Sequence, residues 1–214
     1  MKKNTYPGKF IVIEGLDGSG QTTQAELFKN FFIKQGFKVV LTKEPTLDSE
    51  AGKRIREILD NKIKAEAGVL QELFTQDRRD HLQNKILPAL KEGKIVISDR
   101  YFFSTFAYGA ADGLDLERLI GMNNDFLLPD LTFILKVSPE VCVERIEKRG
   151  KGIKLFEKKE KLEKVWETYR ILPGRFENVY MVEGERTKEE VFSQIKDIVL
   201  SQLTSNISKK NKEV

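Results

Sequence analysis

The chain has 214 residues, of which 40% are hydrophobic and 33% charged, and this length and balance are typical of one compact domain with a buried core. A formal net charge of +4 is too small to indicate a nucleic-acid-binding protein, and the single cysteine and single histidine exclude a disulfide framework and leave little room for a zinc site. No apolar run approaches the roughly 20 residues that cross a bilayer, so we expect a cytoplasmic protein whose partners include no membrane and no nucleic acid.

Short apolar runs alternate along the chain with longer amphipathic runs. The apolar runs predict buried strands at 10–13, 39–41, 95–97, 131–137 and 179–182. The helical spacing of apolar residues predicts helices at 22–35, 50–59, 65–75, 77–91, 139–149, 155–169 and 188–203. Strands separated by helices need crossover connections, so the sequence predicts a three-layer α/β/α fold with a five-stranded parallel sheet.

No internal repeat or linker divides the chain, and residues 1–204 form the predicted domain. Residues 205–214 are polar and rich in lysine, so we expect them to form a disordered tail. Ligands of parallel sheets bind at the carboxyl ends of the strands. Polar residues that directly follow a predicted strand are therefore the first candidates for a functional site.

A glycine-rich turn follows the first predicted strand and leads into the first predicted helix. Successive backbone N–H groups of such a turn point at a phosphate chain, and the glycines allow the backbone to come close to the ligand. The hydroxyl of Thr22 stands where it can join the shell of a magnesium ion. The predicted phosphate-binding residues are Gly15, Leu16, Asp17, Gly18, Ser19, Gly20, Gln21, Thr22 and Thr23.

One position departs from the phosphate-loop pattern G-x-x-x-x-G-K-[ST], because Gln21 replaces the lysine. A glutamine donates neutral hydrogen bonds worth about 1 kcal/mol, whereas a charged donor contributes about 1.5–3 kcal/mol. Phosphate binding by the backbone survives this change, but phosphoryl transfer is expected to slow by about 10- to 100-fold unless another cation replaces the charge. Restoring lysine at position 21 is expected to give equal or higher turnover.

Three further segments accompany the glycine-rich turn. They are Lys43-Glu44-Pro45 after the second strand, Phe74-Thr75-Gln76-Asp77-Arg78 on a helix, and Asp99-Arg100-Tyr101 after the third strand, with Ser104, Thr105 and Tyr108 beyond it. In this order and spacing, over residues 10–203, the segments resemble the thymidylate kinase family of P-loop nucleoside monophosphate kinases. The resemblance implies transfer of the γ-phosphoryl group of ATP to dTMP with Mg²⁺, and a homodimer.

The resemblance also implies roles around the phosphate groups. Arg100 is expected to hold the acceptor phosphate, and Arg56 resembles a second arginine that reaches it. Asp17 is expected to lie near the transferred phosphoryl group, and Asp99 beside the phosphates. The implied catalytic residues are Asp17, Arg100 and Arg149, and the implied Mg²⁺ ligands, partly through water, are Thr22, Asp17 and Asp99.

On the nucleoside side, the resemblance implies that the ring of Phe74 lies against thymine and that Arg78 contacts its O4. Thr105 is expected to contact thymine N3, and Tyr108 to pack at the sugar and disfavour a 2′-hydroxyl group. The implied substrate-binding residues are Glu44, Arg56, Phe74, Arg78, Asp99, Arg100, Thr105 and Tyr108.

Family members whose phosphate loop lacks an arginine carry a catalytic basic residue in a short helical lid. The loop of this chain has no arginine, so the resemblance implies a lid over residues 145–157. Its implied basic residues are Arg145, Arg149 and Lys151. Arg149 is the residue that we expect to replace the charge missing at position 21.

Alternatives stay open at the level of sequence. The chain could be a kinase for another nucleoside monophosphate or deoxynucleoside, or a nucleotide-binding protein with weak catalysis because of Gln21. Asp99 and Arg100 could form a structural ion pair, and Phe74 could belong to the core. Arg78 would then be solvated helix surface, and His81 is expected to be a supporting or surface residue rather than a catalyst.

Overall fold

The computed structural model describes residues 1–148 and 155–210, with side chains described for residues 1–148 and 159–202. The strands are β1 (Lys9–Gly15), β2 (Val39–Lys43), β3 (Ile95–Asp99), β4 (Leu131–Lys136) and β5 (Val179–Glu183). The α-helices are α1 (Gln21–Lys34), α2 (Glu50–Leu59), α3 (Ala67–His81), α4 (Leu87–Lys91), α5 (Phe102–Ala111), α6 (Leu116–Met122), α7 (Pro139–Glu147), α8 (Leu155–Tyr169) and α9 (Lys188–Lys210). A π-helix, η1 (Leu82–Ile86), joins α3 to α4, and a 3₁₀-helix, η2 (Leu172–Gly174), precedes β5.

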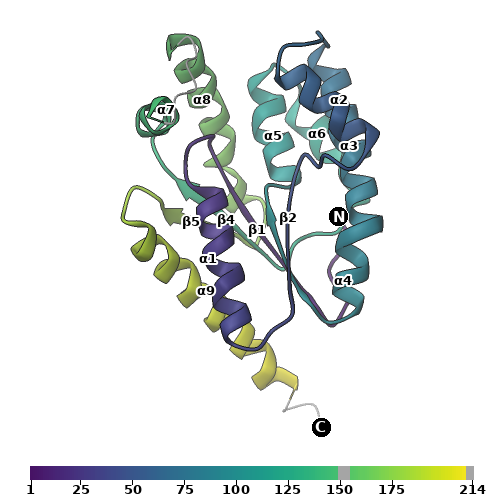
Figure 1. Ribbon diagram of the computed structural model, residues 1–214, viewed down its shortest axis with the longest axis vertical. Helices are drawn as coiled ribbons and strands as arrows, with labels where there is room; N and C mark the ends of the chain where they lie inside the picture. The colour runs from purple at the N-terminus through teal and green to yellow at the C-terminus, as the bar shows by residue number, and fades with distance from the viewer. Residues whose placement is uncertain (149–154, 211–214) are drawn as a thin grey trace.

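The five strands form one parallel sheet in the order β2-β3-β1-β4-β5, with helices on both faces (Figure 1). The predicted three-layer α/β/α fold of a P-loop nucleotide-binding protein is therefore confirmed. The strand order changes direction after β1, so that β3 and β4 flank β1 on opposite sides. The carboxyl end of β1 thus lies at the switch point where open parallel sheets bind their ligands.

Alternating side chains of β1 supply both halves of the core. Phe10 and Val12 pack with residues of α4, α5 and α8, whereas Ile11 and Ile13 pack on the other face with residues of α1 and α9. All four side chains are fully buried. Burial of each stabilises the fold by about 1.5–3 kcal/mol relative to exposure, which fixes the strand register next to the glycine-rich turn.

The helices differ from the prediction in three places. The two helices predicted at 65–75 and 77–91 are one nearly continuous rod of α3, η1 and α4, in which a wider turn precedes Pro88, whose nitrogen cannot donate an α-helical hydrogen bond. No helix was predicted for α5 or α6. Helix α5 is buried on nearly all sides and has no polar stripe, which removes the periodic signal of a helix. Helix α9 continues past residue 203, and residues 211–214 lie outside the described part of the chain.

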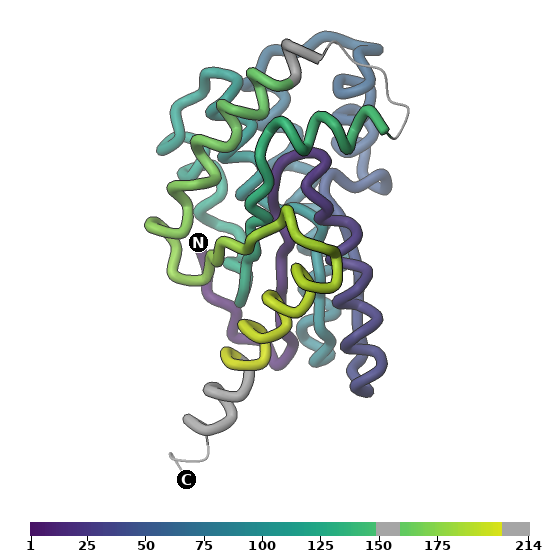
Figure 2. The backbone as a smooth tube through the Cα atoms, turned by 90° about the vertical axis from the view of Figure 1, so that its left-hand side faces the viewer, coloured from purple at the N-terminus to yellow at the C-terminus, as the bar shows by residue number. Residues whose placement is uncertain are grey.

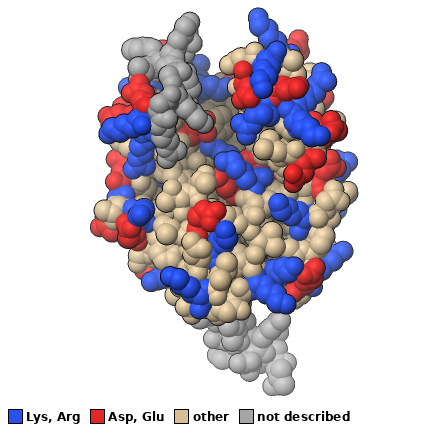
Figure 3. Space-filling model, viewed as in Figure 1, with Lys and Arg blue, Asp and Glu red and all other residues tan. Residues whose placement is uncertain are grey.

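The surface is hollowed above the carboxyl ends of the strands, and Lys and Arg side chains flank the hollow (Figure 3).

Within the described ranges, no helix combines the length and apolar composition needed to cross a bilayer.

Candidate active site

The turn after β1 has the geometry of a phosphate-binding loop. Gly15, Gly18 and Gly20 have φ angles of 148°, 91° and 104°, values that side chains rarely tolerate. A Cβ at Gly18 would lie 2.6 Å from the carbonyl oxygen of Cys142, because α7 crosses directly over the loop (Figure 2). Gly20 is the N-cap of α1, and no side chain of the described residues caps that helix end. Its first N–H groups are therefore available to an anion.

Gln21 lies across this loop and is almost fully buried. Its Nε2 donates a hydrogen bond to the carbonyl oxygen of Gly15 at 2.7 Å, and its Oε1 accepts one from Nη2 of Arg100 at 3.4 Å. The glutamine thus acts as an acceptor as well as a donor. A lysine could reproduce only the first of these contacts.

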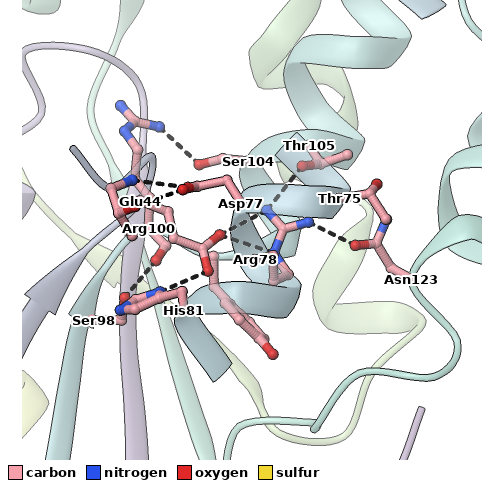
Figure 4. Close-up of polar contacts among 12 residues, drawn as sticks. Glu44, Thr75, Asp77, Arg78, His81, Ser98, Arg100, Ser104, Thr105 and Asn123 are labelled. Atoms are coloured by element: carbon pink, nitrogen blue, oxygen red, sulfur yellow. Dashed lines mark hydrogen bonds and ion pairs between the residues drawn. The ribbon is translucent and has the colours of Figure 1, made fainter. Parts of the chain in front are cut away.

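Arg100 directs its guanidinium group toward the glycine-rich turn. Nη2 donates to Oδ1 of Asp17 at 2.7 Å. Nη1 donates to Oγ of Ser104 at 2.8 Å (Figure 4). The guanidinium also lies 5.3 Å from the centre of the Tyr108 ring. Burial disfavours its charge, but Tyr108, Asp17, Tyr169 and Glu14 together outweigh this effect and hold the pKa of Arg100 well above its usual value. The structure therefore brings the predicted residues Asp17, Gln21, Arg100 and Tyr108 together around one cation.

Asp99 at the end of β3 does not pair with Arg100, so the alternative of a structural ion pair between these neighbours is wrong. Its Oδ2 accepts hydrogen bonds from Oγ1 of Thr22 at 2.6 Å and from Nζ of Lys43 at 3.0 Å. Among the described residues, the buried Oδ1 of Asp99 has no hydrogen-bond partner. Two of the predicted magnesium ligands, Thr22 and Asp99, are thus in direct contact.

Arg78 is buried, with 1% of its side chain exposed, and its guanidinium is held by three partners (Figure 4). Nε and Nη2 both lie 2.8 Å from Oε2 of Glu44, Nη1 donates to Oδ1 of Asn123 at 2.6 Å, and Nη2 donates to Oγ1 of Thr105 at 3.1 Å. The alternative of a solvated Arg78 is wrong. The predicted substrate residues Glu44, Arg78 and Thr105 form one hydrogen-bonded group.

His81 extends this group away from the surface. Its Nδ1 lies 3.1 Å from Oε1 of Glu44, and its Nε2 lies 2.6 Å from Oγ1 of Thr42. The single histidine is therefore buried and supports Glu44, in line with the expected supporting role.

Comparison with known proteins agrees with this geometry. The sequence profile of the family described as thymidylate kinase matches residues 13–195. This chain belongs to the thymidylate kinase family. It is 43% identical over 203 residues to the probable thymidylate kinase of Pyrococcus horikoshii, covering 92% of this chain and 98% of the relative. It is 44% identical over 206 residues to that of Thermococcus onnurineus (91% and 98% covered), and 36% identical over 198 residues to the thymidylate kinase of Caldicellulosiruptor saccharolyticus (90% and 96%).

The remaining residues predicted from the thymidylate kinase resemblance lie around the same site. Arg56 is exposed on α2 and lines a cavity of about 400 Å³ together with Thr22 and Asp99. Phe74 is half-buried on α3. Arg145 of α7 donates to the carbonyl oxygen of Ser19 in the glycine-rich turn at 3.3 Å. Of the other residues predicted for the lid, Arg149 and Lys151 lie outside the described residues.

Several buried polar residues of this thymidylate kinase family member were missed by sequence reasoning. Asn123 follows α6 in a stretch with no recognisable motif, so nothing in the sequence marks it as the partner of Arg78. Asp77 orders the turn before α2 by accepting hydrogen bonds from the backbone nitrogen of Thr46 and from Ser49 Oγ. Glu14 is fully buried in β1. A carboxylate that ends an apolar strand run was a usable signal for Glu14.

Proposed function

We propose that this chain transfers the γ-phosphoryl group of ATP to dTMP and forms dTDP. The observation that carries the proposal is the position of Arg100, whose guanidinium contacts Asp17 and Gln21 of the glycine-rich turn and Ser104 of α5. A cation at this place lies against a loop suited to the phosphates of ATP, where it can neutralise the charge of an acceptor phosphate that approaches them. The family match supports this activity over a kinase for another monophosphate or a weakly catalytic binding protein.

The chemistry requires charge neutralisation rather than a strong base. The second pKa of a phosphate monoester is near 6, so the acceptor is largely a dianion at pH 7 and already nucleophilic. The barrier comes from bringing two anionic groups together, and positioned donors lower it. In this proposal the backbone N–H groups of the loop hold the phosphates of ATP, and Arg100 and Arg56 hold the acceptor phosphate.

The residues near the loop fit a magnesium ion bound together with phosphates. Thr22, Asp17 and Asp99 offer only oxygen atoms, which Mg²⁺ prefers, and the buried Oδ1 of Asp99 lacks a partner among the described residues. No group of three or more His, Cys, Asp or Glu side chains in the described ranges could hold a metal, so nucleotide oxygens and water would complete the shell. When bound, Mg²⁺ would neutralise phosphate charge.

The nucleoside side of the proposal rests on the buried group around Arg78. The contact of Arg78 Nη2 with Thr105 Oγ1 places two polar groups side by side, as contacts to thymine O4 and N3 require. We propose that Phe74 stacks on the base and that Tyr108 packs at the deoxyribose. The hydroxyl of Tyr108 accepts the N–H of Asp17 at 3.0 Å, which joins the sugar side to the phosphate loop.

A coupled assay that follows ADP formation tests the proposal with dTMP, dUMP, UMP and dCMP as acceptors. We expect the highest kcat/KM with dTMP. If dTMP were inert and another of these acceptors were phosphorylated, the proposed substrate would be wrong. A homodimer stays a prediction from the family resemblance, and light scattering after size-exclusion chromatography tests it. A cytoplasmic location stays a prediction from the sequence.

A further inference from the structure

Glu14 is the penultimate residue of β1, directly before Gly15 of the glycine-rich turn, and it is fully buried. Its Oε1 accepts hydrogen bonds from the backbone nitrogen atoms of Tyr101 and Ser104, at 2.8 and 3.3 Å. Its Oε2 accepts from Oγ of Ser104 at 2.6 Å and from the hydroxyl of Tyr169 at 2.9 Å. A buried carboxylate with four converging donors is costly to build, and the phosphate-loop geometry described above does not require it.

These contacts connect Glu14 to both ends of Arg100. Ser104 has one hydroxyl proton and donates it to Glu14, so its oxygen presents a lone pair to Nη1 of Arg100 at 2.8 Å. Tyr101, the neighbour of Arg100 in the chain, is the N-cap of α5, and its N–H group is held by Glu14. Arg100 itself has a φ of 75°, a left-handed conformation that persists only where the surroundings enforce it.

Tyr169 brings a third element to the same carboxylate. It is the last residue of α8, is fully buried, and its hydroxyl also lies 3.0 Å from Oγ of Ser104. The side chains of β1, α5 and α8 therefore meet at Glu14, beneath the guanidinium that the proposed function places between the two phosphate groups.

We propose that Glu14 is a positioning residue for phosphoryl transfer: its carboxylate, fixed by Tyr169, orients Ser104 and the α5 N-terminus and so holds Arg100 at the phosphate loop. The inference rests on the proposed function, because it concerns how Arg100 is presented to phosphates. It assigns no contact with substrate to Glu14 itself.

The protonation of Glu14 supplies a readout for this role. Burial raises its pKa from 4.5 to about 6, against the opposing charge of Arg100 and the hydrogen bonds from Ser104, Tyr169 and Tyr101. The titratable groups that face it are Arg100 after β3, Tyr101 before α5 and Tyr169 of α8, with Tyr108 of α5 beside Tyr169. Protonation of Glu14 removes one acceptor and its charge, and Arg100 then loses its support.

The test compares wild type with E14Q, which keeps the shape of the side chain and removes its charge, in a coupled assay with dTMP and ATP. At pH about 8 we expect kcat/KM for dTMP to fall at least about tenfold, with KM for ATP within about twofold. Below pH about 6 the deficit should shrink, because wild-type Glu14 is then protonated as well. The acceptor phosphate also titrates near pH 6, but equally for both proteins, so their ratio isolates Glu14.

A second variant covers the case in which E14Q does not fold. Y169F removes a hydrogen bond that lowers the pKa of Glu14. We expect its activity at pH about 8 to fall less than that of E14Q, because the donors from Tyr101 and Ser104 remain, and its loss of activity on acidification to begin at a higher pH. If Tyr169 had a structural role alone, Y169F would change the thermal stability of the protein but not the pH at which activity is lost.

D130N is the matched control. Asp130 accepts the N–H of Phe10 at 2.8 Å at the opposite end of β1, so its loss also removes a carboxylate that binds the backbone of this strand. Its pH profile should match that of wild type. If wild type forms no dTDP, the proposed function is wrong. If wild type is active, three results would each contradict this inference alone: E14Q keeps its kcat/KM, E14Q shows a deficit that does not depend on pH, or Y169F loses activity at the same pH as wild type.

Discussion

The guanidinium of Arg100 is held before any phosphate arrives. Asp17, Ser104 and Gln21 accept its hydrogen bonds, and the ring of Tyr108 lies beside it. Groups that are already oriented lose little entropy when they meet an anion, and this favours fast transfer. The left-handed backbone at Arg100 costs about 1–3 kcal/mol, which the surrounding contacts offset.

Replacing Arg100 with lysine is therefore expected to lower kcat/KM for dTMP by about 100-fold. An ammonium group cannot reach Asp17 and Ser104 at once as the planar guanidinium does, although the charge is kept. Steady-state kinetics with dTMP checks this, with R118K on the exposed face of α6 as the control of equal chemistry. Activity in R100K equal to that of wild type would show that only the charge matters.

Replacing Gln21 with lysine is expected to change activity and stability in different directions. In Q21K the lysine supplies charge to bound phosphates, so kcat is expected to be equal to or higher than in wild type. Without nucleotide, the same lysine stands beside Arg100 and loses the acceptor at 3.4 Å, so the melting temperature of the free protein should fall. Thermal unfolding with and without ATP, together with kcat, separates these effects. A large loss of kcat would mean that Arg100 depends on the glutamine oxygen.

At the scale of elements, the position of α7 over the phosphate loop depends on a missing side chain. A Cβ at Gly18 would collide with the Cys142 carbonyl oxygen at 2.6 Å and approach Cγ1 of Ile146 at 3.0 Å. The two atoms belong to the helix backbone and to a buried core side chain, so neither can move freely. The loop and α7 therefore form one packed unit.

G18A is expected to lower the free energy of unfolding by about 2–4 kcal/mol, from backbone strain plus this collision. Gly36 is the matched control, because it also has a positive φ, of 84°, but no atom of the described residues lies within 4 Å of a Cβ there. G36A should therefore show only the strain, about 1 kcal/mol. Urea unfolding of both variants measures the difference, and equal losses would rule out the contact with α7.

The elements that the sequence predicted are those with a clear apolar pattern, either a continuous run or a helical spacing. The five strands lie where continuous apolar runs were read, because both faces of a parallel sheet are buried. Helix α5 was missed because it is apolar on nearly every side. The grouping of Arg78 with Glu44 and Thr105 followed from matched motifs, whereas the burial of Arg78 did not, since its partner Asn123 lies far along the chain in a segment without a pattern.

At the scale of the whole molecule, ionisation of Glu14 lowers the stability of the fold, although the ionised form is the one that we propose supports activity. Its pKa is raised from 4.5 to about 6 in the folded protein, so between these values the folded state binds more protons than the unfolded chain. The free energy of unfolding consequently falls as the pH rises through this window, by about 2 kcal/mol in total from this group. The ionised carboxylate that we propose to position Arg100 is thus the less stable form of the core.

This opposition gives a prediction that needs no activity measurement. The stability of wild type relative to E14Q, from urea unfolding at each pH, should decrease by about 2 kcal/mol between pH about 4.5 and about 6, because Glu14 is the only titratable group in which the two proteins differ. The stability of D130N relative to the double variant D130N/E14Q should follow the same curve, because these two proteins also differ only in the titration of Glu14. A relative stability that stays constant across the window would mean that Glu14 keeps an ordinary pKa. If this pH dependence of stability appears together with the proposed pH dependence of kcat/KM, the protonation of Glu14 controls both the free energy of unfolding and the positioning of Arg100 for phosphate binding.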